Sequence, residues 1–90
     1  LRRRPDYPNA VSNYANALLL AGRPAEALAQ LDELLRQAGP SAPLLCSRAV
    51  ALADLGRLAE GAAAVAEALR LEPDFAPARE LQQRLEVAGP

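Results

Sequence analysis

The 90-residue chain contains no histidine, no methionine, no tryptophan and a single cysteine, Cys46. Histidine is the most common general base and the most common metal ligand, and a cysteine without a histidine lacks its usual activating base. One cysteine also excludes an internal disulfide and fits a reducing, cytoplasmic compartment. We therefore expect no catalytic residue, no metal site and no cofactor in this chain.

Lysine is also absent, and ten arginines nearly balance eleven acidic residues, which leaves a net charge of −1. This balance provides no positively charged surface for nucleic acid or for an anionic membrane. No apolar run reaches the length of a transmembrane helix, and no signal peptide is visible. Arginine without lysine points to a GC-rich, bacterial genome. The only basic cluster, Arg2-Arg3-Arg4, is expected to be a solvated helix end.

The sequence does contain a tandem repeat. Gly22-Arg23 returns as Gly56-Arg57, and residues 1–10 (LRRRPDYPNA) are similar to residues 69–78 (LRLEPDFAPA), which lie two such periods further on. The spacing between Gly22 and Gly56 defines the repeat period. A fixed period of this length is typical of one supersecondary unit stacked on copies of itself. We divide the chain into residues 1–7 (the end of a preceding, truncated repeat), a first copy at 8–41, a second copy at 42–75, and a capping helix with its stop signal at 76–90.

Each copy is expected to form two helices. Apolar residues recur at three- and four-residue spacing in both halves of a copy, which places them on one stripe of a helix. Between the halves of the first copy, Gly22 suits the left-handed conformation that ends a helix, and Pro24 suits the first turn of the next. The predicted helices span about 8–21, 24–37, 42–55, 58–71 and 75–87, packed as consecutive antiparallel pairs.

The repeated positions resemble the 34-residue pattern of the tetratricopeptide repeat (TPR) family. The first copy presents Val11, Tyr14, Ala15, Leu18, Ala27 and Leu31 at the pattern positions, and the second presents Leu45, Arg48, Ala49, Leu52, Gly61, Val65 and Pro73. The resemblance covers nearly the whole chain. It implies an all-α fold, namely an α-solenoid in which antiparallel helix pairs form a right-handed superhelix.

Two positions depart from this pattern. Arg48 stands where the pattern has leucine, and we expect its stem to lie along the helix interface while its guanidinium reaches water or an acid such as Asp32 or Glu33. The closing proline of the first copy has moved to Pro40, so the start of the third helix is expected within about one residue of Ala42. Small residues are expected where helices approach most closely, at Ala15, Ala27, Ala49 and Gly61.

The resemblance also implies a concave peptide-binding groove, lined by the first helix of each copy. The positions in question are Asn9, Ser12, Asn13, Asn16, Leu19 and Leu20 in the first copy, and Pro43, Cys46, Ser47, Val50, Ala53 and Asp54 in the second. Because an amide both donates and accepts, Asn13 and Asn16 are suited to bracket the peptide group of an extended ligand. We expect both amides to be accessible and free of internal hydrogen bonds. An ordinary solvated helix face is the alternative.

Residues 10–22 (AVSNYANALLLAG) resemble the first helices of the repeats in O-linked N-acetylglucosamine transferases, where such an asparagine recurs. Ser47 replaces it in the second copy. The favoured function is a non-catalytic TPR scaffold that binds a protein or peptide partner. The alternative is a substrate-recruiting repeat segment of a larger bacterial glycosyltransferase or sulfotransferase. The clamp that some TPR proteins use on chaperone carboxylates is rejected, because it needs cations where Ser12 and Ser47 stand.

The N-terminal edge is expected to be incomplete. Only Leu1–Arg4 correspond to the helix that would precede the first copy, so apolar surface around Leu1 and Val11 should be uncovered. Uncovered apolar patches favour association between molecules. We expect self-association through this edge. The related 35-residue RNA-binding repeat is disfavoured by the 34-residue period and the slightly acidic charge.

Overall fold

The computed structural model describes residues 14–88, with side chains described up to Glu86. Residues 14–20 are helical, and they are followed by α2 (Pro24–Ala38), α3 (Ala42–Asp54), α4 (Leu58–Leu71) and α5 (Ala76–Ala88). Within these described residues there is no strand. The chain is therefore an all-α helical repeat, as the sequence predicts. The described helix boundaries agree with the predicted ones to within one residue, and the start of the first helix lies outside the described residues.

The two helices of each copy are connected by a tight turn, and the turns of the two copies have the same structure. Gly22 has φ of 79° and Gly56 has φ of 81°, a left-handed conformation that glycine adopts without a steric penalty. After each glycine, an arginine amide donates back across the turn, from Arg23 N to Leu18 O and from Arg57 N to Leu52 O, both at 2.8 Å. These bonds satisfy carbonyls that the end of a helix leaves without a partner. The sequence repeat is thus also a repeat of hydrogen bonding.

The third helix begins where a side chain can cap it. Ser41 has an extended backbone conformation, and its hydroxyl accepts a hydrogen bond of 3.4 Å from Leu44 N. Serine at this position satisfies one of the free amides in the first helical turn. The helix starts at Ala42, as predicted. The displacement of Pro40 therefore does not move the start of the helix.

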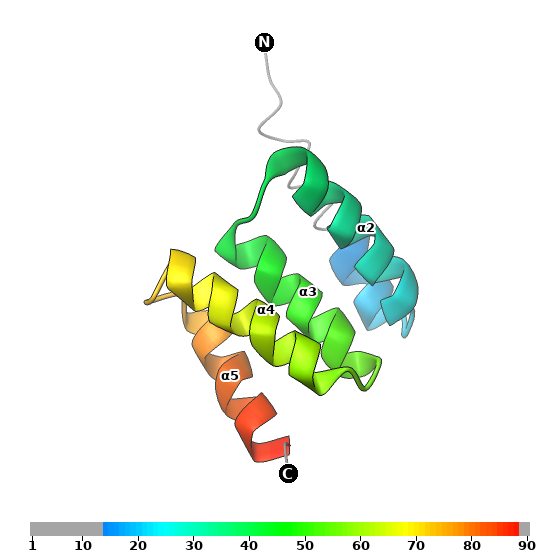
Figure 1. Cartoon of the computed structure of the whole chain (residues 1–90). Coiled ribbons are helices and arrows are strands. Elements are labelled where there is room, and N and C mark those ends of the chain that lie inside the picture. Colours follow the sequence, from blue (N-terminus) through cyan, green and yellow to red (C-terminus); the bar gives the residue numbers. More distant parts are fainter. Residues whose placement is uncertain (1–13, 89–90) are drawn as a thin grey trace.

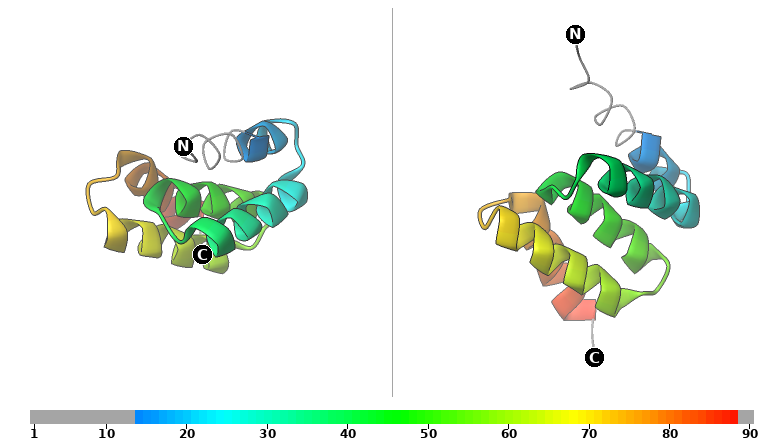
Figure 2. Two further views of the ribbon diagram at one scale, coloured as in Figure 1. Left: turned by 90° about the horizontal axis from the view of Figure 1, so that it is seen from above. Right: turned by 45° about the horizontal axis from the view of Figure 1, so that its top comes forward.

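The helices form two layers (Figures 1 and 2). Helices α2 and α4 lie on one side, and residues 14–20, α3 and α5 lie on the other. Helix α3 is central, because it packs against α2, α4 and α5. Its apolar side chains join buried clusters with the helices on either side. The handedness of the superhelix is not measured by these contacts and stays a prediction.

The small residues predicted at helix contacts are buried. Ala15, Ala27 and Ala49 are fully buried, and Gly61 is buried as well. A Cβ added to Gly61 would lie 3.2 Å from the carbonyl oxygen of Ala49, closer than carbon and oxygen normally approach. Helices α3 and α4 therefore pack with almost no side chain between them at this point, because a larger residue would force the pair apart.

Candidate binding surface

Of the two asparagines predicted to bind a peptide, the structure describes only Asn16. Asn9, Ser12 and Asn13 lie outside the described residues, as do Leu1 and Val11 of the predicted N-terminal edge. Asn16 is exposed, as predicted, but its Oδ1 accepts a hydrogen bond of 3.4 Å from the hydroxyl of Ser47 on α3. The expectation that its amide makes no internal hydrogen bond is therefore wrong for the oxygen. The reason is that neighbouring copies bring these two polar positions face to face.

Cys46 does not line an open groove. Its side chain is only 8% exposed and packs in a buried cluster with residues of α3, α4 and α5, among them Ala49, Val65 and Ala78. Burial raises the pKa of its thiol, because a thiolate is poorly solvated inside an apolar core. The structure thus departs from the expected groove position, and the thiol has the character of a small core side chain.

Leu20 lies at the other extreme, with 90% of its side chain exposed at the end of the helical segment 14–20. Its equivalent in the second copy is Asp54, which is also exposed. The two positions are therefore accessible in both copies, as a groove position should be. Their chemistry differs, since one copy presents an aliphatic side chain and the other a carboxylate.

Val50 and Asp54 meet residues of α5 around a hollow of about 280 Å³, which we call the α3–α5 hollow. Its residues are Val50, Ala53 and Asp54 of α3, Leu58 at the start of α4, and Leu81, Arg84 and Leu85 of α5. All but two of them are aliphatic, so the lining is apolar and carries one carboxylate and one guanidinium. A volume of this size accommodates one or two side chains of a peptide, and a larger organic ligand would not be enclosed.

The charges of the α3–α5 hollow are available to a ligand. Five arginines in the described residues form ion pairs: Arg23, Arg36, Arg48, Arg57 and Arg70. Within the same residues, Arg84 makes no ion pair, and neither does Asp54 on the facing helix. An unpaired, exposed guanidinium retains its full capacity to bind a carboxylate.

The sequence interpretation missed the contribution of α5. The sequence predicts a capping helix with its stop signal at residues 76–90, and this prediction assigns none of these residues to the groove. In the structure Ala78 and Leu81 are buried, while Leu85 is half-buried and borders the hollow. Arg84 lies beside them because residues 81, 84 and 85 share one side of a helix. The i, i+3, i+4 spacing is therefore the signal that could have identified this wall.

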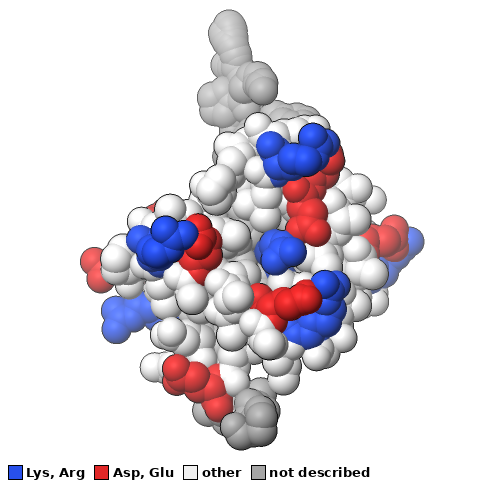
Figure 3. All heavy atoms as spheres, in the orientation of Figure 1, with Lys and Arg blue, Asp and Glu red and all other residues white. Residues whose placement is uncertain are grey.

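The opposite face, formed by α2 and α4, carries paired charges (Figure 3). Basic and acidic side chains alternate over it, so no large patch of one sign is visible from this side. Four of the pairs join residues three apart in the sequence, and such exposed pairs contribute little to stability. This face offers no field that would attract a strongly charged ligand.

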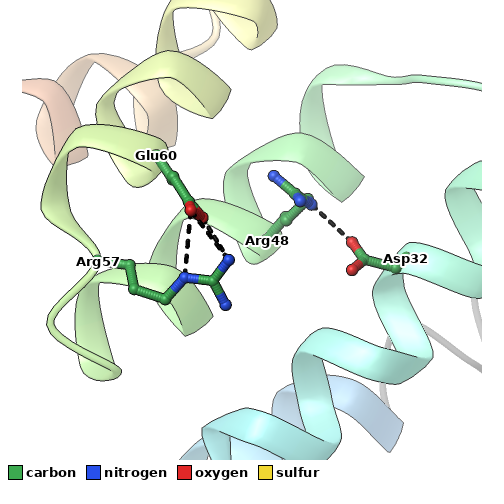
Figure 4. Close-up of polar contacts among 4 residues, drawn as sticks. All are labelled: Asp32, Arg48, Arg57 and Glu60. Atoms are coloured by element: carbon green, nitrogen blue, oxygen red, sulfur yellow. Dashed lines mark hydrogen bonds and ion pairs between the residues drawn. The ribbon is translucent and has the colours of Figure 1, made fainter.

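One ion pair on this face connects two helices. Nε of Arg48 on α3 donates to Oδ1 of Asp32 on α2 at 2.6 Å, beside the Arg57–Glu60 pair at the start of α4 (Figure 4). This pairing confirms the predicted partner of Arg48. The arginine keeps only 30% of its side chain exposed, so its stem covers apolar surface while its head reaches the acid.

No group of three metal-binding side chains comes together in residues 14–88. None of the helices in this range is both long enough and apolar enough to cross a membrane. What the arrangement provides is a shaped surface with a few polar groups, which suits recognition of another molecule.

A family model described as tetratricopeptide repeat matches residues 8–33. The matched range includes the helical segment 14–20, the Gly22 turn and the larger part of α2. The match supports a relation of this first helix pair to the TPR family. No curated protein and no solved structure is significantly similar to the chain. The more specific resemblance to O-linked N-acetylglucosamine transferases therefore stays a hypothesis.

Proposed function

We propose that the chain is a non-catalytic TPR module that binds a peptide segment of a protein partner on the face formed by residues 14–20, α3 and α5. The α3–α5 hollow is the observation that carries this proposal. It offers an apolar lining for an aliphatic side chain, with Arg84 and Asp54 to bind a carboxylate and a donor group of the ligand. In this proposal residues 8–41 and 42–75 are the two TPR units.

The alternative of a recruiting segment in a larger bacterial transferase uses the same face. The sequence feature that suggests this alternative is the asparagine pair. However, the side-chain oxygen of Asn16 already accepts a hydrogen bond from the hydroxyl of Ser47. No observation on the described residues favours this alternative over a scaffold. A bacterial source, a cytoplasmic location and self-association through the N-terminal edge remain predictions from the sequence.

The test is a selection of random peptides on the full chain, followed by affinity measurements with a labelled peptide. Arg84→Glu and Asp54→Lys reverse the two charges of the hollow at exposed positions, so neither should disturb the fold. We expect each reversal to weaken or strengthen binding by about tenfold, according to the charge of the selected peptide.

Arg79→Glu is the matched control, because Arg79 is an exposed arginine on the same helix that borders no part of the hollow. Its affinity should equal that of the unchanged chain. Peptides whose affinity ignores both reversals, or responds equally to Arg79→Glu, would refute the proposed site.

A further inference from the structure

The α3–α5 hollow presents two opposite charges that do not neutralise each other. Among its lining residues only Asp54 of α3 and Arg84 of α5 are charged, and both are exposed. Neither forms an ion pair with any described residue, and they form none with each other. The other lining residues are aliphatic. One apolar hollow therefore carries a carboxylate on one wall and a guanidinium on the other.

The equivalent place one copy earlier carries no charge. A shift by one repeat period converts Asp54 into Leu20 and Arg84 into Val50, and none of the other equivalent residues is charged. The side chain of Leu20 is 90% exposed, so this position is open to a ligand in both copies. The two opposite charges are thus a feature of the later copy alone, and the repeat pattern does not account for them.

The walls of the two places also differ. In the earlier copy the hydroxyl of Ser47 on α3 donates to Oδ1 of Asn16 at 3.4 Å, so polar groups bridge the two helices. The equivalent residues in the later copy are Leu81 and Val50, which form no side-chain hydrogen bond and line the hollow instead. Only the later copy therefore offers apolar surface for an aliphatic side chain between two unpaired charges.

This arrangement favours a ligand with one charge of each sign. An acidic ligand is attracted by Arg84 and repelled by Asp54, and a basic ligand experiences the reverse. A ligand that carries both charges is attracted at both walls. Because the two walls belong to different helices, they also determine the order in which the two charges must follow each other along the ligand.

We propose that the α3–α5 hollow recognises a dipolar peptide segment, in which an aliphatic residue lies between a basic residue that pairs with Asp54 and an acidic residue that pairs with Arg84. This inference rests on the proposed function, because it concerns the same peptide site, and it adds the charges of the ligand and their order. Alternate residues of an extended peptide face the same side. The two charged residues therefore lie two positions before and two positions after the aliphatic one.

The probes are four peptides that are blocked at both ends, so that their side chains carry all the charge. Two are dipolar, with the sequences EALAK and KALAE, and two carry like charges, EALAE and KALAK. Each is titrated into the isotope-labelled full chain and followed by NMR. We expect one of the dipolar peptides to bind about tenfold more tightly than each of the other three.

The double variant Asp54→Lys with Arg84→Glu exchanges the two charges of the hollow and leaves the net charge of the chain unchanged. It should therefore prefer the dipolar peptide of the opposite order. Asp74→Lys with Arg79→Glu is the matched control, since both residues are exposed and neither borders the hollow. This control should keep the preference of the unchanged chain.

The inference would be overturned by equal affinity for the two dipolar peptides, by a like-charged peptide that binds as tightly as the better dipolar one, or by no saturable binding. A preference that the double variant does not exchange, or that the control exchanges as well, would also overturn it. The proposed function survives all of these outcomes if peptides from the random selection still respond to Arg84→Glu. Its failure and the failure of this inference are thereby distinguished.

Discussion

The two copies of the repeat place the same residue in opposite surroundings. Ala17 and Ala51 are both alanine, lie one repeat period apart and occupy the same position on the first helix of their copy. Ala17 is exposed, whereas Ala51 has no exposed surface. The equivalent positions Leu28 and Ala62 also differ in burial, although here the first copy is buried and the second is exposed.

The difference teaches that the neighbours of a helix decide its burial in a repeat protein. Helix α3 is covered on several sides, because α2, α4 and α5 all pack against it. Residues 14–20 of the first helix pack in buried clusters with α2 and α3. Stability in an array of this kind is a sum of terms within repeats and terms between neighbouring repeats. Residues of α3 should therefore contribute most to stability, and matched substitutions can test this.

The largest expected effect comes from a charge at the buried alanine. Ala51→Glu places a carboxylate where no surface is exposed, which should cost about 3 kcal/mol or more and unfold much of a small domain. Ala17→Glu at the equivalent exposed position should change the free energy of unfolding by less than about 0.5 kcal/mol. Urea denaturation followed by circular dichroism measures both. Equal losses at the two positions would contradict the contrast between the copies.

A smaller effect is expected at the close helix contacts. Ala27→Leu should overpack the first helix pair and reduce the free energy of unfolding by about 1–3 kcal/mol, because Ala27 is fully buried. Ala29→Leu is the control, since Ala29 lies on the same helix and is exposed. Thermal melts of the two variants give the comparison. A melting temperature that Ala27→Leu leaves unchanged would show that the helix register is wrong.

The ion pair between α2 and α3 should contribute less. Arg48 and Asp32 have no counterpart in the other copy, where the equivalent positions hold Tyr14 and Ala66. A double-mutant cycle with Arg48→Ala and Asp32→Ala should give a coupling of about 0.2–1 kcal/mol, because both side chains are partly solvated. A coupling of zero would mean that the pair forms without fixing how the two helices pack.

The smallest expected effect is a pH dependence at Glu33. Hydrogen bonds from Arg36 and then Gln37 lower the pKa of this exposed carboxyl. A carboxyl with a lowered pKa in the folded state stabilises the fold above its unfolded pKa, and this contribution is lost as the pH falls through the folded pKa. The unchanged chain should therefore have a slightly higher melting temperature than Glu33→Gln at neutral pH, and the difference should disappear as the pH falls through the folded pKa of Glu33.

Glu67→Gln sharpens the same comparison. Glu67 is the counterpart of Glu33 and also pairs with an arginine three residues on, but Leu71 stands where the first copy has Gln37. We expect a smaller difference in melting temperature for Glu67→Gln than for Glu33→Gln. A larger one would show that the glutamine donor adds nothing.

Most of the fold could be predicted from the sequence, because its signals are local. The turns at Gly22 and Gly56 and the apolar spacing within each helix act over a few residues, and they placed the described helix boundaries to within one residue. The small residues at the closest contacts could also be predicted, since their positions recur with the repeat. The same reasoning found Val50 and Asp54 of the proposed binding surface.

The tertiary structure alone decided which of these positions are open. The sequence pattern treats Cys46 as a groove residue, yet packing of α4 and α5 against α3 buries it. The pattern treats Asn16 as free, yet the next copy brings Ser47 to its amide. Arg84 lies at the proposed binding surface because α5, which follows α4 along the chain, folds back beside α3. Helix periodicity reports one face of one helix, whereas exposure depends on every helix packed around it, and that information lies in the three-dimensional arrangement.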